Sequence, residues 1–147
     1  MRWHPDYANF SDATEKRKRG YPDLPLFEGD EVIDPMVTSA DQRAFTRGFT
    51  ERAVDFIRRH RDEPFFLYVA HPMPHVPLFV SAESEGRTER GLYGDVISEI
   101  DDSVGAILAA LDECGIDDDT LVIYASDNGP WLSYGNHGGS TGPLREG

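Results

Sequence analysis

The sequence has a single cysteine, no long apolar run and far fewer basic than acidic side chains. Cys114 has no second cysteine to pair with, so no internal disulfide can form. Cysteine usage therefore does not indicate whether the protein works in an oxidising or a reducing compartment. No segment approaches the roughly 20 apolar residues that span a bilayer, and the first residues lack the apolar core of a signal peptide. With 14 Lys and Arg against 27 Asp and Glu, the net charge of −13 argues against a general nucleic-acid-binding surface.

Three common functional motifs are also missing. The acidic run "DDDTL" lacks the glycine and terminal glutamate of an EF-hand loop. The glycine-rich stretch "GGSTGPLREG" has no Gly-Lys-Ser/Thr, so it is not a P-loop, and no Gly-x-Ser-x-Gly nucleophile elbow occurs. What remains is a chain of 147 residues with 39% hydrophobic side chains, enough for one globular domain with a core.

We expect one domain over residues 1–147, divided into two parts. Residues 1–38 carry prolines and acids at short intervals without a sustained hydrophobic period, which predicts an irregular surface connection. Residues 39–147 predict a core in the order helix, strand, helix, strand, with loops that could form an active site.

Hydrophobic periodicity predicts two amphipathic helices. The first spans about 40–60, with Ser39 as its N-cap and Gln42 three residues later at the spacing of a capping box. The second spans about 88–114, with an apolar stripe along one face and Gly115 placed to cap its carboxyl end.

A short, continuously apolar run follows each helix, "PFFLYVA" after the first and "TLVIYA" after the second. Two strands that are apolar on both faces and joined by a helix form a right-handed βαβ unit in a parallel sheet, so the predicted fold class is α/β. Parallel strands end at the same edge, so the loops after Ala70 and Ala125 are expected to open into one crevice.

Polar side chains with useful chemistry follow both predicted strands. His71 and His75 follow the first strand; Asp127 and Asn128, and later His137, follow the second. Asp and Asn oxygens suit Ca²⁺ or Mg²⁺, and a histidine can hydrogen-bond an anion or move a proton, so a metal-assisted reaction on an anionic ester would use both. On the residues alone, a plain Asp-Asn-Gly turn and histidines that only pack or cap are the commoner explanations.

Three motifs together resemble the type I sulfatases, in particular the arylsulfatase and N-acetylgalactosamine-6-sulfatase-like branch. They are "PFFLYVAHPMPHVPLF", "RGLYGDVISEIDDSVGAILAAL" and "DDDTLVIYASDNGPWLSYGNHGGSTGPLREG", and the likeness runs from about Leu26 to Gly147. The resemblance implies part of an alkaline-phosphatase-like α/β fold, an aryl or sugar sulfate ester as substrate, and a periplasmic, secreted or lysosomal setting.

The resemblance also implies a role for each candidate site residue. Asp127 and Asn128 correspond to ligands of the active-site Ca²⁺, and His75 corresponds to the histidine that hydrogen-bonds the sulfate and protonates the leaving alcohol. His71 corresponds either to a substrate contact or to structural support, and His137 to a substrate contact in a loop where the family varies.

The family's nucleophile is a formylglycine made from the first residue of a Cys/Ser-x-Pro/Ala-x-Arg motif, and the 147 residues contain no such motif. The resemblance therefore implies an internal fragment of the catalytic domain of a Ca²⁺-dependent sulfatase, without turnover on its own. Two alternatives stay open: a phosphoesterase of the alkaline phosphatase superfamily, and a non-catalytic, truncated metal-binding domain.

Overall fold

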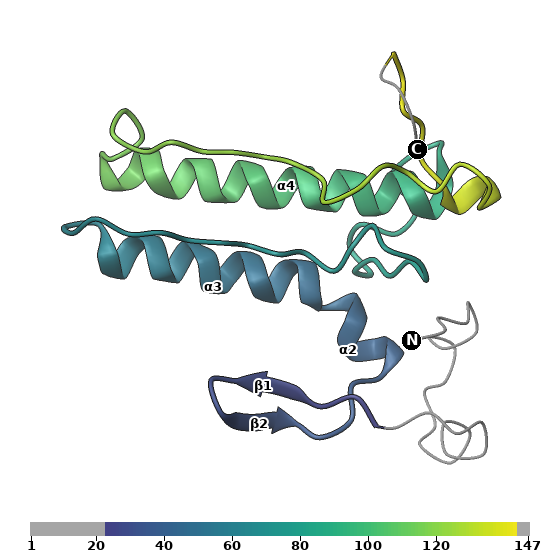
Figure 1. The fold of residues 1–147 in the computed structure, drawn as a ribbon, viewed down its shortest axis with the longest axis horizontal. Coiled ribbons are helices and arrows are strands. Elements are labelled where there is room, and N and C mark those ends of the chain that lie inside the picture. The colour runs from purple at the N-terminus through teal and green to yellow at the C-terminus, as the bar shows by residue number, and fades with distance from the viewer. Residues whose placement is uncertain (1–22, 144–147) are drawn as a thin grey trace.

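A computed structural model describes residues 23–143, which form two long helices, each accompanied by an extended segment, and a small hairpin (Figure 1). The helices α3 (Phe45–His60) and α4 (Gly91–Cys114) pack side by side. The chain leaves each helix through a tight turn and runs back along it (Figure 1). No helix within residues 23–143 combines the length and the apolar character that crossing a membrane requires.

A two-stranded hairpin lies where the sequence predicted an irregular connection, so that prediction is wrong for residues 26–34. Strand β1 (Leu26–Glu28) pairs antiparallel with β2 (Glu31–Asp34). The strands are joined by two residues, the first of which is Gly29 at φ 58°, a backbone angle that favours glycine. A two-residue connection that begins with glycine is a hairpin signal, and "LFEGDEVID" contains this signal between two short runs with apolar residues.

The first predicted helix is divided in two, because α2 (Ser39–Arg43) ends before α3 begins, with Ala44 at the junction. The N-cap is Thr38, not Ser39, and the capping box is completed by Asp41, not Gln42. The Asp41 carboxylate accepts a hydrogen bond from the Thr38 backbone N–H at 2.7 Å. A carboxylate is a stronger acceptor than an amide, which explains why the box is shifted by one residue.

The second predicted helix corresponds to α4, which starts at Gly91 instead of about 88. The Asp95 carboxylate accepts backbone N–H bonds from Gly86 and Thr88, each at 2.8 Å, and so holds the preceding segment in a turn. These bonds, led by the one from Gly86, lower the pKa of Asp95. At the other end, Gly115 caps the helix in the left-handed conformation, as predicted.

Two hydrophobic clusters hold the helices and loops together. One lies between α3 and α4 and is centred on Ile57, Ala110 and Leu111, with Phe65 and Leu67 of the first extended segment packed against it. The other lies on the first half of α4, where residues 73–80 cover the helix; its buried members are Met73, Val76, Leu78, Phe79, Val80, Val96 and Ile100.

The predicted parallel βαβ sheet is not formed within residues 23–143, where the only sheet is the β1–β2 hairpin. Residues 65–70 and 120–125 are extended, but no ladder joins them to each other or to another strand. A strand requires partners for its backbone N–H and C=O groups, and each segment instead runs along the helix that precedes it (Figure 1). Apolar side chains are consequently left in solvent, with Phe66 88% exposed and Leu121 85% exposed.

Candidate active-site loops

His75 lies on the loop that follows the first extended segment. The neighbouring residues Met73 and Val76 are buried against α4, whereas His75 is exposed. Its Nδ1 lies 2.6 Å from the carbonyl oxygen of Val76. A carbonyl can only accept, so Nδ1 carries a proton and Nε2 is the ring nitrogen that can gain or release one. The loop therefore fixes the orientation of this imidazole.

Asp127 and Asn128 lie in the turn after the second extended segment, and both are exposed. The Asn128 side-chain amide donates to Asp127 Oδ1 at 3.0 Å, and the Ser126 hydroxyl donates to the Asn128 carbonyl oxygen at 2.7 Å. These contacts hold a carboxylate and an amide oxygen next to each other, which are the oxygen donors that Ca²⁺ prefers.

The donor chemistry fits Ca²⁺, but the number of donors is too small for a complete site. Calcium takes about six to eight oxygen ligands. Within residues 23–143, no group of three or more His, Cys, Asp or Glu side chains is arranged to hold a metal ion. Asp127 and Asn128 can thus form part of a calcium site, not all of it.

His137 lies in the glycine-rich loop, in the short helix η2 (Gly135–His137), and is exposed. Its ring lies 6.5 Å from that of Tyr134, centroid to centroid. The loop is tightly folded, because a side chain at Gly138 would place its Cβ 2.2 Å from the Trp131 carbonyl oxygen. His137 therefore lies in a loop whose backbone is tightly packed.

The loops from the two extended segments meet on the first half of α4. Tyr134 packs against the same cluster that contains Met73 and Val76, the neighbours of His75 on the first loop. Figure 1 shows both loops at the amino-terminal end of α4. The sequence predicted that the two loops converge at the edge of a sheet. They do converge, but on a hydrophobic cluster that packs against α4.

His71 behaves differently from His75, although both belong to the same loop. It is half-buried, and its Nε2 lies 3.0 Å from the hydroxyl of Ser103 on α4. Burial lowers the pKa of His71, and the nearby Glu99 carboxylate opposes that shift only in part. The ring faces inward, toward the helices.

Comparison with known proteins identifies the family. The Sulfatase family model matches residues 3–146. This chain belongs to the sulfatase family. The resemblance seen in the sequence is thereby confirmed, and the family implies an alkaline-phosphatase-like α/β fold for the domain of which these helices and extended segments are part.

Several named sulfatases are similar to this sulfatase chain. N-acetylgalactosamine-6-sulfatase of Mus musculus is 40% identical over 132 residues, which cover 84% of the chain and 25% of the relative. Steryl-sulfatase of Homo sapiens is 39% identical over 107 residues, 69% of the chain and 18% of the relative. Arylsulfatase A of Bos taurus is 39% identical over 104 residues, which cover 67% of the chain and 20% of the relative. The chain thus spans about a quarter or less of the length of these relatives.

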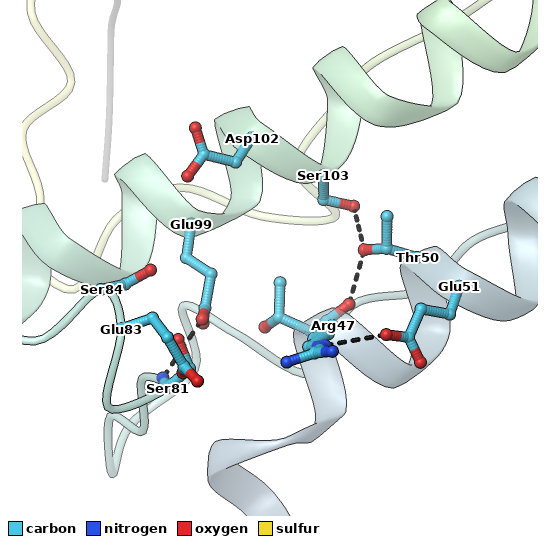
Figure 2. A pocket seen from close by; sticks show the side chains of 10 residues that line it. Arg47, Thr50, Glu51, Ser81, Glu83, Ser84, Glu99, Asp102 and Ser103 are labelled. Atoms are coloured by element: carbon cyan, nitrogen blue, oxygen red, sulfur yellow. Dashed lines mark hydrogen bonds and ion pairs between the residues drawn. The ribbon is translucent and has the colours of Figure 1, made fainter.

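A cavity that lies between α3 and α4 in this sulfatase chain was not predicted from the sequence. It has a volume of about 230 Å³ and is lined by Thr50, Ser81, Glu99 and Ser103, among other side chains (Figure 2). Glu99 is only 8% exposed and accepts a hydrogen bond from the Ser81 backbone N–H at 3.2 Å. Polar residues at 99 and 103 interrupt the apolar stripe of α4, and this interruption is the signal that could have revealed the cavity.

Proposed function

We propose that this chain contributes a proton donor and part of a Ca²⁺ site to the hydrolysis of sulfate esters by a sulfatase catalytic domain. The observation that supports the proposal most is the packing of two loops on one hydrophobic cluster, because it brings the His75 loop and the loop that follows Asp127 to the same end of α4. Family membership supplies the reaction type, sulfuric ester hydrolysis.

The proposed role of Asp127 and Asn128 is to ligate the cation. Their carboxylate and amide oxygens stand side by side in an exposed turn and suit calcium. A bound Ca²⁺ supplies positive charge that holds sulfate oxygens, and it offsets the negative charge of a protein whose net charge is −13. The remaining ligands are expected to be water, substrate and other protein oxygens.

The proposed role of His75 is to give a proton to the leaving oxygen of the ester. The contact between its Nδ1–H and the Val76 carbonyl oxygen orients the ring, so the transferable proton resides on Nε2. An exposed, oriented imidazole is suited to general-acid catalysis.

The nucleophile is the part of the proposed reaction that these 147 residues do not provide, because they contain no Cys/Ser-x-Pro/Ala-x-Arg motif. We therefore expect the isolated chain to show no turnover. The relatives named for aryl, steryl and sugar substrates have nearly equal identities, from 39% to 40%, so the substrate proposal is limited to sulfate esters as a class.

A hybrid enzyme tests the proposal. The aligned quarter of mouse N-acetylgalactosamine-6-sulfatase is replaced by this chain, and the folded, secreted hybrid is assayed with an aryl sulfate and the matching aryl phosphate. We expect hydrolysis of the sulfate that requires Ca²⁺, and none by the 147-residue chain alone. A hybrid in which the relative's nucleophile is replaced by alanine measures the background hydrolysis. Turnover by the isolated chain, or a preference of the hybrid for phosphate, would contradict the proposal.

A further inference from the structure

A line of hydrogen bonds starts at His71 and connects it to residues on α4 and then on α3. His71 Nε2 lies 3.0 Å from Ser103 Oγ, and Ser103 Oγ lies 2.6 Å from Thr50 Oγ1. Figure 2 shows the contact between Ser103 and Thr50. Thr50 Oγ1 in turn lies 2.6 Å from the backbone carbonyl oxygen of Thr46. Ser103 is 3% exposed and Thr46 is 2% exposed, so the line runs through the interior and not along the surface.

The number of available protons fixes the direction of every bond in this line. The Thr46 carbonyl can only accept, so the single hydroxyl proton of Thr50 points to it. Ser103 must then donate its own proton to Thr50 Oγ1. Since Ser103 has no further proton to offer, the bond to His71 exists only if Nε2–H of the imidazole is the donor. The line therefore specifies the Nε2–H tautomer of His71.

Burial disfavours the charged form of this imidazole. Its surroundings lower the pKa of His71, chiefly through desolvation of the charged ring, and Glu99 counteracts the shift. Its Nδ1 is buried and accepts no hydrogen bond from residues 23–143. The ring also lies against Phe49, with 6.4 Å between the centroids. With Nε2–H already used and Nδ1 lacking a proton, the neutral ring has no donor left for a sulfate oxygen.

The position of Ser103 on α4 relates this line of bonds to the His75 loop. Val96, Ile100 and Ser103 are all buried, and their spacing places them on one face of the helix. Val96 and Ile100 pack against Met73 and Val76, while Ser103 holds His71. The same face of α4 thus holds the loop at three residues: His71, Met73 and Val76.

We propose that His71 is a positioning residue: a neutral Nε2–H imidazole that ties the start of the His75 loop to α3 and α4 and does not contact the sulfate. The part of this inference that concerns catalysis rests on the proposed function, in which His75 is the proton donor. The part that concerns the loop rests only on the hydrogen bonds and the burial of His71.

The first test uses two amides as replacements for His71. The Gln side chain places its N–H close to the position of Nε2, whereas the shorter Asn places it close to Nδ1. Amide hydrogen exchange of the 147-residue chain, followed by mass spectrometry at low micromolar concentration, compares wild type with His71→Gln, His71→Asn and Ser103→Ala. We expect exchange of residues 72–81 to accelerate about three- to tenfold in His71→Asn and Ser103→Ala, which is the equivalent of one lost hydrogen bond. His71→Gln should remain close to wild type, and residues 104–114 should not change in any variant.

Equal acceleration in His71→Gln and His71→Asn would overturn the inference, because the ring would then act through its volume and not through Nε2–H. The inference would also be overturned if none of the three variants changed the exchange rates of residues 72–81. The same holds if these amides were unprotected from exchange in the wild type.

The tautomer provides an independent readout. Long-range proton–nitrogen NMR spectra of the chain labelled at its five histidines should show one Nε2-protonated neutral ring that gains its second proton at a lower pH than an ordinary histidine, and that signal should vanish in His71→Gln. An Nδ1–H tautomer of His71, or a ring that gains its second proton at a higher pH than an ordinary histidine, would overturn the inference.

Kinetics of the hybrid enzyme test the catalytic part. We expect His71→Asn to lower kcat about tenfold with little change in KM, and His71→Gln to restore most of kcat. A raised KM with unchanged kcat would indicate a substrate contact and would overturn the positioning role. A hybrid without any sulfatase activity, combined with the expected exchange and tautomer results, would refute the proposed function and leave His71 as an anchor of the loop.

Discussion

Replacement of His75 with alanine is expected to reduce kcat of the hybrid enzyme for an alkyl sulfate by about a hundredfold or more, the usual range for loss of a general acid. The ring is held by its Nδ1–H bond to the Val76 carbonyl oxygen, so the variant loses a proton donor that is already oriented. The loss should be much smaller for an aryl sulfate with an acidic phenol, because such a leaving group departs without protonation.

A matched control for this prediction is His60→Ala. His60 lies at the end of α3, with its Nδ1 2.5 Å from a carboxylate oxygen of Glu63, so the substitution removes the same side chain at a site without a proposed role. Its kcat should stay within about twofold of the parent hybrid, as is usual for surface substitutions. An equal loss for alkyl and aryl sulfates in His75→Ala would show that His75 does not act as the acid.

Replacement of Asp127 with alanine is expected to raise the Ca²⁺ concentration needed for half-maximal activity of the hybrid by at least about tenfold. The variant loses a charged oxygen ligand next to Asn128, and calcium affinity depends on the number and charge of such ligands. The measurement is a calcium titration of activity after chelation. Activity should return in part at high Ca²⁺, because the remaining ligands stay in place.

The control for Asp127→Ala is Asp118→Ala. Both side chains are exposed acids, so the two substitutions change the net charge equally. Asp118 lies in the turn after α4, at the opposite end of the helix from the converging loops (Figure 1). If both variants shift the calcium titration to the same extent, Asp127 acts only through its general charge and is not a ligand.

Local signals in the sequence predicted the helices well. The apolar periodicity gave α4 within a few residues, and Gly115 fixed its end because the left-handed conformation favours glycine. The N-cap was misplaced by one residue, since Thr38 and Ser39 are both good caps and only the tertiary structure shows that Asp41 completes the box.

Non-local features were less accessible from the sequence. "FFLYVA" and "TLVIYA" were predicted to be strands, but neither forms one within residues 23–143, because pairing in a sheet depends on distant partners that no local pattern reveals. The candidate site shows the same division. His75, Asp127 and Asn128 are proposed from loop chemistry and resemblance, whereas the bond from His71 to Ser103 joins residues 32 positions apart and became visible only in the structure.

The most direct test of the account is whether His75 and Asp127 act on the same reaction step. The measurement is a double-mutant cycle on kcat/KM of the hybrid enzyme with an alkyl sulfate, comparing His75→Ala, Asp127→Ala and the double variant. Residues that act as one unit show strongly non-additive losses. If both loops form one active site, the double variant should be about as impaired as the worse single variant; losses that multiply would show that the two loops act independently.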